Sequence, residues 1–196
     1  MKEKRNVLII YYSKHGTTRK LAEYISIGIE KNSVNAVIRT VPNINNKEKK
    51  YDKQLDHSIV SLEDVKKCSG IILGSPCYFG NMAAPLKHYI DQTTDIWING
   101  LLVNKPAAVF CSSSSMHGGQ ETTLVSMMFP LLHHGAILVG VPFFKTHLMH
   151  TAKGGSPYGP THVNDNQKEN QINEIEKKIC ISLGKRVSDL VVKIKK

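Results

Sequence analysis

The chain of 196 residues lacks the cysteine patterns that identify disulfide-rich and zinc-binding proteins. Its four cysteines, Cys68, Cys77, Cys111 and Cys180, stand far apart and form no CxxC pair. Such spacing predicts neither a disulfide framework nor a zinc site. We therefore expect reduced thiols and no bound metal.

The two common phosphate-binding motifs of nucleotide enzymes are also absent. A P-loop requires GxxxxGK[ST] and a dinucleotide fingerprint requires GxGxxG, and the lone Gly16 after the first apolar run satisfies neither. Nucleoside triphosphates and a dinucleotide held by GxGxxG are therefore poor candidates for the ligand.

Long hydrophobic runs are missing as well: none approaches the roughly 20 residues that a membrane-spanning helix needs. The basic N-terminus, with Lys2, Lys4 and Arg5, passes into a strand-like run without a small-residue cleavage site, so we expect no signal peptide. These observations predict a cytoplasmic protein with no membrane insertion. Because 41% of the residues are hydrophobic, one domain over residues 1–196 can bury a sizeable core.

The net charge of +10 raises the question of a nucleic-acid partner. Lysines gather at the two termini and over residues 47–53, where Glu48 and Asp52 interrupt them, and they form no single stripe with aromatic residues. We interpret the charge as solvated faces and expect no nucleic-acid binding. Attraction of an anionic cofactor is an alternative role for it.

Short apolar runs alternate with amphipathic helical patterns, which is typical of a doubly wound α/β fold with a parallel sheet. The predicted strands cover residues 6–12, 36–40, 70–74, 107–111 and 136–141. The predicted helices cover residues 17–31, 62–68 with Ser61 as cap, the stretch up to 93, the stretch after 120 and 172–194. A polar, irregular excursion is expected over residues 42–58. The helix after Gln120 is apolar nearly all round, so it should be buried in the core or in a subunit contact.

The first polar loop follows the first strand and consists of Ser13, Lys14, His15, Gly16, Thr17 and Thr18. A phosphate there would meet the free N–H groups at the start of a helix, and hydroxyl groups would donate further hydrogen bonds. A hydroxyl-rich loop of this size suits a terminal monophosphate, as in flavin mononucleotide (FMN). The alternative is ordinary turn and N-cap chemistry.

Two more polar loops follow the third and fourth predicted strands. The second contains Pro76, Cys77, Tyr78, Phe79 and Gly80, and the third contains Ser112, Ser113, Ser114, Ser115, Met116, His117 and Gly118. Ligands of open parallel sheets lie at the carboxyl ends of the strands, so the three loops can converge on one ligand. A flexible linker is the alternative for the serine run, and it fits poorly beside a buried strand.

Several histidines need separate interpretation. His133 and His134 are adjacent and point about 100° apart on a helix, so only one can face a given ligand. His147 and His150 lack the HExxH glutamate and a third ligand, which argues against a metal pair. His117 is either a turn residue or a ligand contact.

The stretches YYSKHGTT, GSPCYFGNMAAPLKHYIDQ, HGGQETT, LLHHG and GGSPYGP, together with the lone Trp97, resemble the WrbA-type NAD(P)H:quinone oxidoreductases. The resemblance implies a flavodoxin-like five-stranded parallel sheet of order 2-1-3-4-5, FMN at its carboxyl edge and a homotetramer. It assigns the FMN phosphate to Ser13–Thr18, the isoalloxazine ring to residues 76–80, and a third flavin contact to residues 112–118. It also implies that Trp97 forms a wall of the substrate pocket and that His133 lies beside the flavin.

Three positions depart from the family pattern. His15 replaces an aromatic residue that helps to hold the nicotinamide nucleotide, Tyr78 replaces a basic residue, and Asp95 replaces a glycine.

The reaction that the resemblance implies is a two-electron, ping-pong reduction of quinones by NAD(P)H. The flavin carries the redox chemistry, so no catalytic acid, base or nucleophile is required. Tyr78, Phe79 and Trp97 would supply flat walls for the stacked substrates, although each could instead pack in the core. A one-electron flavodoxin-like carrier and a non-catalytic FMN-binding protein are the alternative functions.

Overall fold

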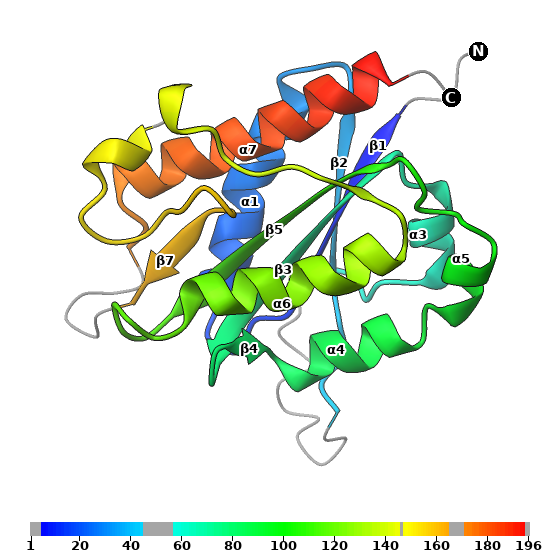
Figure 1. Cartoon of the computed structure of the whole chain (residues 1–196), viewed down its shortest axis with the longest axis horizontal. Coiled ribbons are helices and arrows are strands. Elements are labelled where there is room, and N and C mark those ends of the chain that lie inside the picture. The colour runs from blue at the N-terminus through cyan, green and yellow to red at the C-terminus, as the bar shows by residue number, and fades with distance from the viewer. Residues whose placement is uncertain (1–4, 45–56, 146, 165–170, 195–196) are drawn as a thin grey trace.

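The computed structural model describes residues 5–44, 57–145, 147–164 and 171–194. A parallel sheet of order β2-β1-β3-β5-β6 crosses the molecule, and the short β7 also pairs with β5 (Figure 1). Its strands are β1 Asn6–Tyr11, β2 Asn35–Thr40, β3 Gly70–Tyr78, β5 Pro106–Ser113, β6 Ile137–Leu138 and β7 Thr161–Val163. The doubly wound α/β fold predicted from the alternating pattern is confirmed.

The helices form a layer on each face of the sheet (Figure 1). They are α1 Thr17–Glu30, α3 Leu62–Lys67, α4 Ala84–Asp91, α5 Thr94–Ile98, α6 Gln120–His133 and α7 Glu174–Lys193. Helices α1 and α7 cover one face, and α3 to α6 cover the other. Alternate residues of β1 contribute to the two cores: Ile9 packs on the α1 side and Ile10 on the opposite side. A strand buried on both faces therefore appears in the sequence as a continuous apolar run.

Two helix starts carry the capping signals that stabilise them. Ser61 caps α3, as predicted, and forms a capping box with Asp64. Asn173 forms the equivalent box with Glu176 at the start of α7. The carboxylate of Glu176 also accepts hydrogen bonds from Gly154 N–H (3.0 Å) and is 2.8 Å from Nδ1 of the buried His162, so one side chain joins α7 to β7 and to the loop before it.

The fifth strand differs from its prediction over residues 136–141. Only β6 pairs in the ladder at its start, and the chain then leaves the sheet and returns as β7 beside Cys111, Ser112 and Ser113. Val141 N–H donates to Pro157 O instead of to β5, and Pro142 has no N–H to continue the ladder. The segment between β6 and β7 contains two 3₁₀ turns, Phe143–Lys145 and His147–His150.

Helix α6 is buried along one face only. Leu124, Met127 and Leu131 are buried, whereas Phe129 and Leu132 are more than half exposed. The core of one chain therefore covers only one of the two apolar faces of this helix, and the alternative of a subunit contact remains a prediction for the other face. The excursion expected over residues 42–58 lies mostly outside the described residues.

Candidate functional site

The three polar loops meet at the carboxyl edge of the sheet. Thr18 Oγ1 lies 2.9 Å from Ser112 Oγ, which joins the first loop to the third. Cys77 Sγ donates to Gly118 O at 2.7 Å, which joins the second loop to the third. The expected convergence of strands one, three and four is present in the geometry. Side chains therefore tie the three loops to one another at this edge.

The first loop has the features of an anion cradle. Among the described residues, Ser13 Oγ is buried and has no hydrogen-bond partner. Gly16 has a φ of 83°, a conformation that favours glycine, and only the tip of Arg19 comes within 4 Å of the position a Cβ would occupy. The first turn of α1 contains no acidic residue, so its N–H groups and dipole favour a negative ligand.

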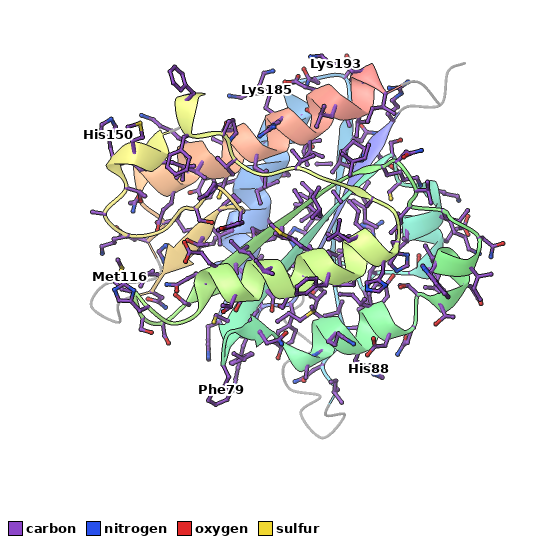
Figure 2. All side chains as sticks on the ribbon, viewed as in Figure 1. Phe79, His88, Met116, His150, Lys185 and Lys193 are labelled. Carbon is purple, nitrogen blue, oxygen red and sulfur yellow. The ribbon has the colours of Figure 1, made fainter. Side chains whose placement is uncertain are left out.

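The second loop is a tight hairpin between β3 and β4 (Asn81–Met82). Tyr78 pairs with Asn81, and the two residues between them, Phe79 and Gly80, have φ values of 51° and 73°. Both values are positive, as a type I′ hairpin turn requires. Phe79 is 106% exposed, so it does not pack on its own chain, and Figure 2 shows it projecting from the hairpin. A bulky side chain in a strained backbone conformation and in full contact with solvent points to a role outside the fold.

The third loop is buried at its start and exposed at its tip. Ser112 and Ser113 are buried at the end of β5, whereas Ser114, Ser115, Met116 and His117 are exposed. Ser113 Oγ donates to Ser115 O (3.0 Å), and Gln120 Nε2 donates to the same oxygen (2.7 Å). These bonds hold the serine run in one shape, which argues against a flexible linker.

Other residues that sequence reasoning passed over support these loops. Thr123 Oγ1 donates to Cys77 Sγ at 3.0 Å, and Ser75 Oγ accepts from Ala83 N–H at 2.8 Å. Gly119 passes so close to Gly80 that a Cβ on it would lie 2.7 Å from the Gly80 Cα. The sequence feature that could have identified such supporting residues is the occurrence of small polar residues directly after a buried strand. Thr123 could also have been identified because it lies within the stretch HGGQETT.

A tyrosine and a histidine meet beside the cradle. Tyr11 Oη lies 2.9 Å from His57 Nδ1, and the two rings pack edge to face. Burial raises the pKa of Tyr11 to about 12. Burial also lowers the pKa of His57; the charge of Glu23 opposes this shift, and Arg19 and Arg39 reinforce it. His57 therefore favours the neutral state in the folded protein, a feature that only the tertiary contact reveals.

Trp97 and His133 lie at the opposite, amino edge of the sheet. Trp97 belongs to α5, which precedes the first residue of β5, and Asn104 N–H donates to Gly135 O just after α6 ends. Figure 1 shows α5 and the end of α6 far from the loops that follow β3 and β5. Both side chains are exposed, Trp97 by 54%. Within one chain, therefore, neither Trp97, the expected wall of the substrate pocket, nor His133, expected beside the flavin, reaches the cradle.

His134 has a contact within its own chain. Its Nε2 lies 2.9 Å from Thr93 Oγ1, which ties the end of α6 to the corner between α4 and α5. Burial, together with the charge of His133, lowers its pKa. His133 is the exposed member of the pair, so it is the one available to a ligand or to another subunit.

A groove runs beside the hairpin along the exposed face of α6. Its lining residues come from the hairpin, from α6 and from the loop before β7: Gly80, Asn81, Glu121, Thr122, Val125, Ser126, Phe129 and Tyr158. The groove is continuous with the carboxyl edge because Gly80 belongs to both.

Metal-binding clusters and membrane-spanning helices are absent from the part of the chain that the structure describes. No group of three or more histidine, cysteine and acidic side chains is placed to hold a metal ion. No helix in those ranges is long and apolar enough to cross a membrane.

The fold is that of a flavodoxin-like α/β protein, with three polar loops converging at the carboxyl edge of the sheet. Residues 5–150 match the family model described as NADPH-dependent FMN reductase. The chain is 35% identical to an NAD(P)H dehydrogenase (quinone) of Solidesulfovibrio magneticus, over 97% of this chain and 99% of the relative. It is also 35% identical to the protein of the same name from Geotalea daltonii, over 96% and 97%. The chain belongs to this FMN reductase family.

Solved structures show the same fold at lower sequence identity. A WrbA-like flavodoxin from Agrobacterium tumefaciens superposes with a TM-score of 0.69 at 18% identity and covers 97% of this chain and 99% of that one. A flavodoxin from the domain Archaea gives a TM-score of 0.64 at 19% identity, over 95% and 99%. The predicted flavodoxin-like architecture is thus confirmed.

Proposed function

We propose that this protein is an FMN-dependent NAD(P)H:quinone oxidoreductase. The observation that carries the proposal is the convergence of three polar loops, the first of which contains Ser13, whose buried hydroxyl lacks a partner among the described residues. The full-length similarity to NAD(P)H dehydrogenases (quinone) supports the same reaction. When bound, FMN would supply the two-electron chemistry that passes reducing equivalents from the nicotinamide nucleotide to the quinone.

Different residues of the carboxyl edge would then bind the phosphate of FMN, its ring and the nicotinamide nucleotide. Ser13, Thr17, Thr18 and the N–H groups of α1 would hold the phosphate, and residues 76–80 and 112–118 would flank the ring. His15 and Tyr78, both exposed, would face the entering nucleotide. A ping-pong cycle fits one shared slot, since oxidised nucleotide has to leave before a quinone stacks in the same place.

The substrate slot would be completed by another subunit. Trp97 and His133 are exposed at the far edge of their own chain, and Phe79 is exposed beside the cradle. A homotetramer in which these side chains meet across subunits accounts for both exposures and for the apolar face of α6 at Phe129 and Leu132. We place this assembly in the cytoplasm, consistent with the four free cysteines.

The test is a steady-state assay of the FMN-loaded protein with NADH and with NADPH, using benzoquinone as acceptor. Rapid oxidation of either nucleotide, with FMN reduced by the nucleotide alone, supports the oxidoreductase. Binding of FMN without turnover would establish a non-catalytic flavoprotein. Reduction only by a partner protein, and not by nucleotide, would establish an electron carrier. Comparing the two nucleotides decides which one the site prefers.

A further inference from the structure

The segment between β6 and β7 presents three large apolar side chains to solvent. Phe144 is 96% exposed, Met149 is 74% exposed and Phe143 is 50% exposed. They lie on the two 3₁₀ turns, which stand away from the sheet at the left of Figure 1. Isolated apolar residues on a surface are ordinary, whereas these three lie within seven positions on two turns that contact each other and so form a candidate contact surface.

The patch has a fixed base. Leu148 is buried in the core of the α1 and α7 layer. A Cβ on Gly155 would touch both Leu148 and Ile179 of α7, so the segment is packed tightly onto that helix. Leu148 therefore points inward while its neighbour Met149 points outward. The separation of buried and exposed apolar residues shows that the exposed ones are presented by a packed turn.

The surroundings of the patch are basic. The 43 residues from Thr122 to Asn164 include no aspartate or glutamate. His150 and Lys153 are exposed beside the apolar side chains, and Arg186 of α7 reaches the same segment through a 2.8 Å bond from Nη1 to Gly140 O.

The acids on the neighbouring stretch of α7 are already paired. Glu174 lies 2.6 Å from Lys177, and Asp189 lies 2.7 Å from Lys185. Within the part of the chain that the structure describes, an approaching anion would therefore meet Lys153 and Arg186 at the patch, while the carboxylates of Glu174 and Asp189 are neutralised by lysines.

The patch is separate from the surfaces assigned above to subunit contacts. It belongs to the α1 and α7 layer, whereas Trp97 and Phe129 project from elements that cover the opposite face of the sheet. In Figure 2, His150 and Met116 lie at the same end of the molecule, the end where the loops of the carboxyl edge are found.

We propose that the segment containing Phe143, Phe144 and Met149 docks the protein on an anionic phospholipid surface. The aromatic and thioether side chains enter the boundary between headgroups and acyl chains, and His150, Lys153 and Arg186 contact the lipid phosphates. Apolar contact and charge attraction act together here, and neither alone gives stable binding. Such docking is peripheral and needs no membrane-spanning helix. It is independent of the quinone reaction, although it would bring the carboxyl edge close to lipid-soluble quinones.

Co-sedimentation with vesicles tests the proposal on the full-length protein loaded with FMN. The protein should bind vesicles that contain phosphatidylglycerol, bind vesicles of phosphatidylcholine alone at least about tenfold more weakly, and dissociate as salt is raised. The double variant Phe143→Ser/Phe144→Ser should lose about tenfold or more in affinity for the anionic vesicles. Ile27→Ser, which removes an exposed apolar side chain from α1, is the matched control and should bind as the parent does.

Two results would overturn the proposal. One is equal binding of the parent and the double variant to anionic vesicles, which would mean that general basicity is responsible. The other is a change of oligomeric state in the double variant with no change in vesicle binding, which would make the patch an interface between copies. Because neither measurement uses NAD(P)H or a quinone, failure here leaves the proposed reaction untouched.

Discussion

Gly28 of α1 and Gly184 of α7 lie opposite each other where the two helices cross, and neither position has room for a Cβ atom. A Cβ on Gly28 would lie 2.0 Å from Ile181 O, and a Cβ on Gly184 would lie 2.0 Å from Ile25 O. The backbones of the two helices therefore touch directly. This contact sets the spacing of the layer that places the first turn of α1 over β5.

Gly184→Ala should lower the free energy of unfolding by about 2–3 kcal/mol, because the added methyl group has to push two backbones apart. Urea denaturation measures the change, and Lys178→Ala on the exposed side of α7 should stay within about 0.5 kcal/mol of the parent. Helix propensity alone predicts the opposite sign, a gain of about 1 kcal/mol, so a stabilised variant would disprove the close contact.

Ser13→Ala should weaken FMN binding by about 10-fold to 100-fold, the usual effect of losing one hydrogen bond to a charged group. The stability of the FMN-free protein should hardly change, because the Ser13 hydroxyl has no partner among the described residues. Quenching of FMN fluorescence measures the affinity. Ser26→Ala is the control: it removes a hydroxyl on α1 that donates to Glu23 O, and it should leave the affinity for FMN unchanged. Equal FMN affinities for the parent, Ser13→Ala and Ser26→Ala would show that the Ser13 hydroxyl does not bind the phosphate.

Phe79→Gly should lower quinone turnover while it leaves the stability of the fold nearly unchanged. Glycine accepts the positive φ of this turn position, which offsets the flexibility it adds to the unfolded chain, so stability should stay within about 1 kcal/mol of the parent. Quinone turnover should fall about tenfold or more through loss of an aromatic wall. Phe79→Asn, which tolerates the same backbone conformation, should behave in the same way. Full turnover in both variants would show that the exposed ring plays no part in the reaction.

Trp97→Ala should lower kcat/KM for the quinone by about tenfold or more and leave FMN affinity intact, because it removes a wall of the slot and no phosphate contact. Gly16→Val should instead weaken FMN binding, because a branched side chain is strained at this φ and enters the cradle. If sites are shared between subunits, co-assembled Trp97→Ala and Gly16→Val chains should turn over faster than the sum of the two separate variants. Shared sites would be ruled out if sedimentation shows that the parent is a monomer and this monomer is fully active. They would also be ruled out if mixing the two variants gives no gain in turnover.

Acid should destabilise the protein partly through His57. Its folded-state pKa lies below the usual 6.5, because burial disfavours the charged ring. The unfolded chain therefore binds this proton more readily, and stability that is complete above pH 6.5 is lost as the pH falls below that value. His57→Gln should reduce the loss of unfolding free energy between neutral pH and mildly acidic pH. His88→Gln on the surface of α4 is the control, and an identical pH profile for parent and His57→Gln would refute the assignment.

The order of elements could be predicted from the sequence because each depends on local chemistry. Continuous apolar runs such as Val7 to Tyr11 identify strands buried on both faces, and Ser61, as an N-cap residue, predicts the start of α3. Ser13–Thr18 and residues 112–118 stood out because polar residues directly after buried strands are seldom there for packing. The assignment of individual residues to FMN and to the quinone stays a prediction.

Tertiary structure decided the features that depend on distant parts of the chain. The orphaned hydroxyl of Ser13, the Cys77 to Gly118 bond and the neutral-favouring surroundings of His57 arise only when several strand ends meet. The splitting of the fifth strand escaped prediction because Ala136 to Val141 is apolar throughout, and only the competing contact with Pro157 draws it out of the sheet. Local patterns specify which residues form strands and loops. Which loops become a site, and which side chains stay exposed for other partners, follows from the packing that places residues far apart in sequence beside one another.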